Sequence, residues 1–219
     1  AVVEGRGFHP PAPSPGMDDG TYRVLPRPDG EGLRLLDRET YEPVLLAGEG
    51  HDVPVSDLRP GYLVAAELDW SRADPTVETL AVERPTLYAF ADGVDPMFEV
   101  AAETWREARA SGEAMNARTT RNTDSEVNGA VYVFAESGDR GRFEEFRDGT
   151  RPLEPLVDRA NESARGDGDA DSTPPREVFV LRGVDEEFTA VTIALRKGGR
   201  FADTVRETYD LDRPAEPLG

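Results

Sequence analysis

The sequence predicts an α+β protein with two unlike halves. The N-terminal half is expected to be all-β, a small barrel or sandwich, and the second half to place helices on a mixed or antiparallel sheet. Short apolar segments recur about every ten residues between positions 20 and 92, separated by Gly, Pro and Asp. Apolar residues at helical spacing begin only after residue 94.

The predicted order along the chain has four parts. Residues 1–16 hold four prolines and three glycines, which predicts a disordered leader. We hypothesise that translation starts at Met17, because a well-formed strand follows it. A small β-barrel-like domain is expected over 17–93 and an α+β domain over 94–210, with a flexible acidic linker at 165–175 and a disordered tail at 211–219.

Strands in the first half are expected at 21–26, 33–37, 43–47, 62–70, 77–83 and 86–91. In the second half, Asp95 and Pro96 are expected to open a helix that ends near Ser111 and resumes after Gly112 through Arg118. Further strands are expected at 128–136, 177–182 and 187–196, the last two antiparallel, and further helices at 141–147, 153–164 and 200–209. Tyr132 and Phe134 share one face of the strand at 128–136, which favours a doubly covered core strand over an exposed surface that stacks bases.

Charge is the most unusual feature of the composition. The chain of 219 residues carries 44 acidic and 25 basic residues, a net charge of −19, and Lys197 is its one lysine. An acid excess with arginine in place of lysine is typical of a protein that works in a high-salt cytoplasm. Cysteine is absent, which excludes disulfides and thiolate chemistry. No apolar run approaches ~18 residues, so no membrane partner is expected.

Three segments of the sequence are similar to a known protein family. TYRVLPRPDGEGLRLLDRETYEPVLL (21–46), LRPGYLVAAELDW (58–70) and PTLYAF (85–90) resemble an uncharacterised protein family of halophilic archaea. The resemblance covers nearly the whole chain from Met17 onward. It implies no catalytic or binding residue, because no function is established for that family.

The search for catalytic chemistry finds no recognisable constellation. The two histidines, His9 and His51, cannot together form a zinc site, and the acidic run at 167–171 lacks the final Glu of a calcium loop. Neither a phosphate-binding glycine loop nor a serine nucleophile motif occurs. We therefore assign no catalytic residue, metal or cofactor from the sequence.

Two windows without acidic residues, at 114–123 and 188–202, are the most informative signal. One explanation is structural: a buried strand lacks acidic residues because charged side chains are rarely buried. The other is an anion-recognising patch on a negative surface. Its candidate residues are Arg118, Arg121, Arg196, Lys197 and Arg200.

Two function classes remain. The first is a non-catalytic binding or adaptor module for a macromolecular partner, either a protein or a nucleic acid. The alternative is an enzyme that acts on a small substrate bearing a phosphate or carboxylate. Convergence of the five cations in a concave pocket would favour the enzyme, and their spread over a flat face would favour the adaptor.

Overall fold

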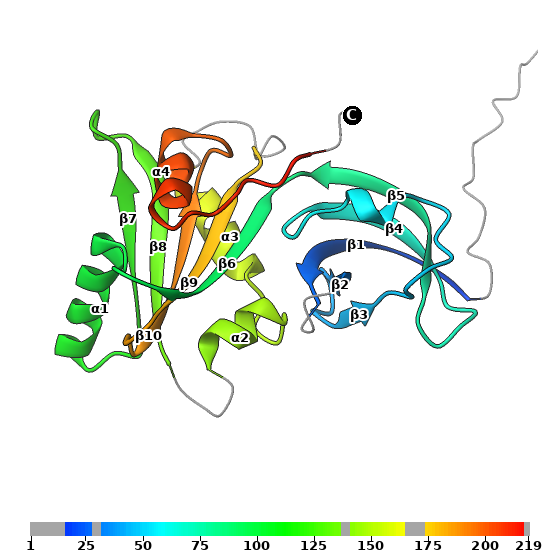
Figure 1. Cartoon of the computed structure of the whole chain (residues 1–219), viewed down its shortest axis with the longest axis horizontal. Coiled ribbons are helices and arrows are strands. Elements are labelled where there is room, and N and C mark those ends of the chain that lie inside the picture. Colours follow the sequence, from blue (N-terminus) through cyan, green and yellow to red (C-terminus); the bar gives the residue numbers. More distant parts are fainter. Residues whose placement is uncertain (1–15, 28–31, 137–140, 165–173, 217–219) are drawn as a thin grey trace, which may run out of the picture.

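A computed structural model of the protein describes residues 16–27, 32–136, 141–164 and 174–216. Within these residues the chain forms two five-stranded sheets and four α-helices (Figure 1), which confirms the predicted α+β class. The predicted leader (1–16) and acidic linker (165–175) lie almost wholly outside the described residues. Among the described helices, none is long and apolar enough to cross a membrane.

The N-terminal sheet is antiparallel, with the order β3-β2-β1-β4-β5. It is an open sheet and not a closed barrel, because in the described residues β3 and β5 are its two edges. Two backbone hydrogen bonds, from Ala47 to Pro75 and from Asp52 to Val77, nevertheless draw the segment after β3 towards β5. The strands are β1 (Met17–Pro26), β2 (Leu33–Asp37), β3 (Pro43–Leu45), β4 (Leu63–Asp69) and β5 (Thr76–Arg84).

Strand alternation explains the two faces of this sheet. Tyr22 and Val24 of β1 and Leu35 of β2 point into a core that the segment between β3 and β4 covers with Leu46 and Leu58. The residues between them therefore point to the opposite face. That opposite face meets the second half of the protein.

The second sheet has the order β6-β9-β10-β8-β7. It is mixed, because β6 and β9 are parallel whereas the other pairs are antiparallel. Its strands are β6 (Leu87–Val94), β7 (Met115–Arg121), β8 (Val127–Ala135), β9 (Glu177–Gly183) and β10 (Phe188–Ala194). The helices are α1 (Glu99–Ser111), α2 (Arg142–Arg147), α3 (Glu154–Ala164) and α4 (Arg200–Thr208).

Helices cover both faces of the second sheet. In Figure 1, α1 and α4 lie on one face, and α2 and α3 lie on the other, between the two sheets. Tyr132 and Phe134 of β8 pack with the α2–α3 side, and Val131 and Val133 pack with the α1–α4 side. The prediction that this strand belongs to the core is confirmed, and its aromatic side chains are not exposed for stacking.

The two halves meet at what we call the junction, the contact of β1 and β2 with α2 and α3. Leu25 and Leu36 belong to the same buried cluster as Phe146 and Leu153. Gly149 follows α2 with φ +77, and a Cβ there would lie 2.7 Å from a methyl carbon of Leu25. The halves are thus packed through a continuous apolar contact.

The region around α1 differs from the expectation. The helix begins at Glu99, with Phe98 and not Asp95 at its N-cap. It ends at Ser111 as predicted, because Gly112 adopts a left-handed conformation with φ 70 and its N–H bonds back to the last turn. The predicted helical continuation through Arg118 is wrong, since these residues form β7.

The C-terminal tail has partners. The sequence predicted disorder over 211–219, and residues 217–219 lie outside the described part. Up to Glu216, the segment hydrogen-bonds to Arg59, Tyr62 and Lys197.

Candidate functional site

The outer strand β7 is the candidate site. In the described residues it pairs with β8 alone, which leaves its other edge without a neighbouring strand. Its residues alternate between exposed and half-buried along the whole strand. Met115, Ala117, Thr119 and Arg121 are the exposed set, and Asn116, Arg118 and Thr120 are the half-buried set.

Local chemistry explains why this segment is a strand. Gly112 ends the preceding helix, and the β-branched Thr119 and Thr120 favour extended backbone. A tight turn then joins β7 to β8. The side-chain oxygen of Asn122 accepts the backbone N–H groups of Asp124 and Glu126, and this closes the hairpin.

The two predicted cations on β7 are held differently. Arg118 reaches across to α1 and forms ion pairs of 2.8 Å with Glu103 and 2.5 Å with Glu107. Arg121 donates from Nη1 to the backbone oxygen of Ser125 at 2.7 Å. The charge of Arg118 is therefore neutralised by carboxylates of α1, whereas Arg121 forms no ion pair among the described residues.

Of the other three predicted cations, Arg196 and Lys197 lie between β10 and α4, and Arg200 is the first residue of α4. Lys197 donates to Glu216 at 2.5 Å and to the backbone oxygen of Pro85 at 2.7 Å. Arg196 and Arg200 are exposed, and within the described residues their side chains form no ion pair. The five candidates thus fall into two groups on different elements, and each residue has its own surroundings.

Burial explains the absence of acidic residues in one of the two windows but not in the other. All seven residues of β10 are buried, which explains why the second window contains no carboxylate up to Ala194. Burial cannot explain the first window, because residues 114–123 are mostly exposed. β7 is thus an exposed edge strand without an acidic residue, in a chain that has 44 of them.

Sequence reasoning missed the charged side chains of the junction. Arg23 of β1 donates from Nε to Glu154 of α3 at 2.5 Å, with both side chains almost fully buried. Arg38 pairs with Asp158 at 3.4 Å. The sequence signal that could have found them is a repeated R-x-L-x-R spacing, at 23–27 and 34–38, which starts on β1 and on β2. In each strand this spacing sets arginine and leucine on the same face.

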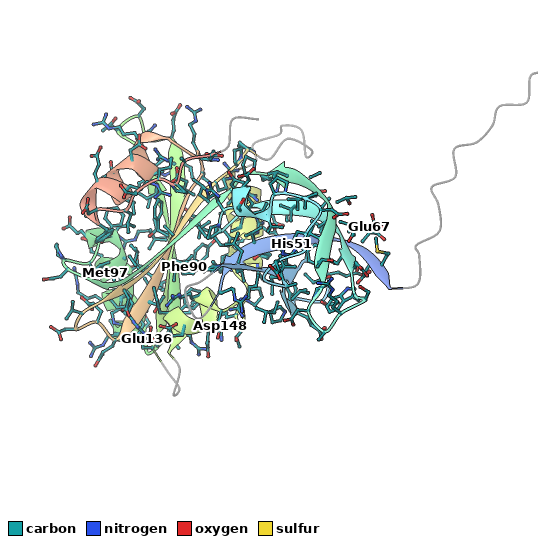
Figure 2. All side chains as sticks on the ribbon, turned by 45° about the vertical axis from the view of Figure 1, so that its right-hand side comes forward. His51, Glu67, Phe90, Met97, Glu136 and Asp148 are labelled. Carbon is teal, nitrogen blue, oxygen red and sulfur yellow. The ribbon has the colours of Figure 1, made fainter. Side chains whose placement is uncertain are left out.

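Figure 2 shows His51 within the N-terminal half and Asp148 on the side of the second half that faces it. The His51 ring has a structural role: Nδ1 accepts the N–H of Val77 at 3.1 Å, and Nε2 lies 2.9 Å from the oxygen of Ala47.

In the described part of the chain, no group of three or more acidic or histidine side chains is arranged to hold a metal ion. The acidic run at 167–171 lies outside that part.

Comparison with known proteins gives one match. A model of a family of unknown function, DUF6663, matches residues 16–214, which is most of the chain. The chain belongs to this family. This match confirms the expected relationship to an uncharacterised family. The family DUF6663 has no assigned activity. No curated protein and no solved structure matches.

Proposed function

We propose that this protein is a non-catalytic adaptor that binds an extended segment of a partner protein along the open edge of β7. The observation that carries the proposal is the absence of acidic residues from an exposed edge strand in a chain of net charge −19. Exposed edge strands usually carry charges or prolines that prevent pairing with other chains. β7 carries no proline and no carboxylate, and of its two arginines Arg118 is paired with Glu103 and Glu107 of α1.

An added strand suits this edge chemically. The backbone N–H and C=O groups at the open side of an edge strand bind an extended peptide through main-chain hydrogen bonds, and the alternating side chains supply specificity. On β7 the N–H of Ala117 donates to the side-chain oxygen of Asn116 at 2.8 Å, so an added strand would have to displace that side chain. The exposed side chains Ala117 and Thr119 are small, and Arg121 offers a positive charge. A partner segment with a carboxylate opposite Arg121 would fit this pattern.

A protein partner is favoured over the other candidates. A second copy pairing antiparallel about the middle of β7 would place Arg118 opposite Arg118 and bring together two chains of net charge −19. A single-stranded nucleic acid is expected to stack its bases on aromatic side chains, and β7 has none. A duplex is bound mainly through cations, and a chain of net charge −19 repels it.

The test compares two edge strands. Ala117→Glu with Thr119→Glu adds two carboxylates to β7, and Thr79→Glu with Ala81→Glu adds two to exposed positions of the edge strand β5. Each variant and the wild type are purified from native cells in molar KCl. Light scattering then gives the mass of the complex, and cross-linking gives the contact sites.

We expect a stoichiometric partner with the wild type and the β5 variant, cross-linked to residues 115–121, and its loss in the β7 variant. A partner that stays bound to the β7 variant would overturn the proposal. So would a wild type that elutes alone, or one that forms a homodimer.

We also propose that the protein is adapted to molar salt, as its composition predicted. The support is the net charge together with the near-absence of lysine. The corresponding experiment concerns the stability of the whole molecule and is described below.

A further inference from the structure

Four arginines from separate segments lie near one another beside the junction, and we call them the arginine cluster: Arg23, Arg38, Arg84 and Arg176. Arg23 of β1 and Arg84 of β5 are both register partners of Leu63 on β4, so they lie in one row across the sheet. Arg176 comes directly before β9. It is held next to the start of β6, because its oxygen accepts the N–H of Leu87 at 3.0 Å.

Only half of the cluster is hydrogen-bonded to carboxylates. Arg23 is paired with Glu154, and Arg38 with Asp158. Arg176 donates instead to neutral acceptors, the side-chain oxygen of Asn161 at 2.8 Å and the backbone oxygen of Leu195.

Arg84 is half-buried, and among the described residues its side chain makes no hydrogen bond or ion pair. Each guanidinium carries five N–H donors, so both Arg84 and Arg176 retain donors for a ligand.

The charges of these two arginines repel each other. Burial lowers the pKa of Arg176 to about 10, and the neighbouring charge of Arg84 adds to the effect. Burial is also the main cause that lowers the pKa of Arg84, and the positive charge of Arg23 lowers it further. The carboxylates of Glu83 and Asp158 act in the opposite direction. Among the described residues no carboxylate pairs with both cations, and two partly desolvated cations in this situation favour the binding of an anion between them.

We propose that Arg84 and Arg176, with Arg38 beside them, bind a small ligand through its phosphate or carboxylate group. A guanidinium matches both groups by paired N–H donors. Arg182 shows this geometry elsewhere in the molecule, since its Nε and Nη2 both donate to the Asp92 carboxylate. Only a small group can reach Arg176, because that residue is 5% exposed. This site lies at the opposite side of the second sheet from β7, and it is independent of the proposed adaptor function.

The test is calorimetric titration with inorganic phosphate and, separately, with acetate, at constant ionic strength. The variant Arg84→Gln removes the accessible cation. Arg200→Gln is the matched control, because Arg200 is exposed and has no ion-pair partner in the described part of the chain. We expect Arg84→Gln to weaken the binding of the preferred anion roughly tenfold or more and Arg200→Gln to leave it unchanged.

Three results would overturn this site. The first is wild-type protein that binds neither anion at ~10 mM. The second is Arg84→Gln protein that binds as the wild type does, and the third is an equal loss of binding in the Arg200→Gln control. If Arg84→Gln fails to fold, Arg38→Gln takes its place. The β7 variant should bind the anion normally, so failure of one proposal does not affect the other.

Discussion

At the scale of single residues, the buried ion pair of the junction between Arg23 and Glu154 is expected to have a large effect on stability. Arg23 also donates to the backbone oxygen of Gly61 at 2.7 Å, and its guanidinium lies 5.4 Å from the centre of the Tyr88 ring. One oxygen of Glu154, Oε2, is buried and has no hydrogen-bond partner among the described residues. Glu154 therefore depends strongly on Arg23, because an unpaired buried charge is far more costly than a pair.

Changing Arg23 to Met should lower the free energy of unfolding by about 3–5 kcal/mol, because Glu154 would remain buried without its partner. The double change of Arg23 and Glu154 to Met should recover most of that loss, since no isolated charge would remain. Urea unfolding in molar KCl measures both. A double variant as unstable as the single one would mean that side-chain packing, not charge, is the cause.

At the scale of elements, the segment after α4 connects the two halves. Arg59 donates from Nε to the backbone oxygen of Ala215 at 3.0 Å, and Tyr62 donates to Glu216 at 3.0 Å. Burial would raise the pKa of Glu216, but hydrogen bonds from Lys197 and Tyr62 outweigh it and lower the pKa. The carboxylate is therefore charged at neutral pH and ties a tail of the second half to the first.

Replacing Glu216 with Gln should expose Lys197 to amine-reactive reagents. The chain has one lysine, so peptide mass spectrometry can follow its labelling separately from the terminal amine. We expect faster labelling and a loss of about 0.2–1 kcal/mol of stability, because the pair is partly exposed. Glu207→Gln is the control, since Glu207 is exposed on α4. Equal labelling rates in all three proteins would show that the tail does not hold Lys197.

At the scale of the whole molecule, net charge governs the response to salt. Unscreened repulsion among the excess carboxylates opposes the compact state, and molar salt shortens the screening length to ~3 Å. Several arginines already pair with carboxylates on the surface, as Arg118 does with Glu103 and Glu107. These local pairs cannot offset a net charge of −19.

Lowering KCl from molar concentration to ~0.1 M should therefore cause cooperative unfolding. Circular dichroism at a series of KCl concentrations, with the melting temperature recorded at each, measures this. A melting temperature that stays constant over the series would contradict the proposed salt adaptation.

Much of the fold could be predicted because its signals are local. Alternation of apolar residues and the turn residues between them placed β2 at its observed bounds and β4, β5 and β8 within one or two residues. The helical continuation after Gly112 was wrong because its residues have no strong preference, and pairing with β8 decided their conformation.

The candidate site could be predicted only in part. The absence of acids between Ala114 and Thr123 is visible in the sequence, but the reason for it is not. The same pattern at Phe188–Ala194 results from burial, and only the positions of the strands within the sheet distinguish the two cases.

The sequence by itself determined the α+β class, the positions of most strands and the strongly acidic character, because these depend on neighbouring residues or on composition. Only the tertiary structure decided that β7 is an edge and that the arginine cluster forms. Arg23 meets Glu154 across 131 positions of the chain. Contacts over such a separation depend on how the two sheets pack, and no local pattern encodes that packing.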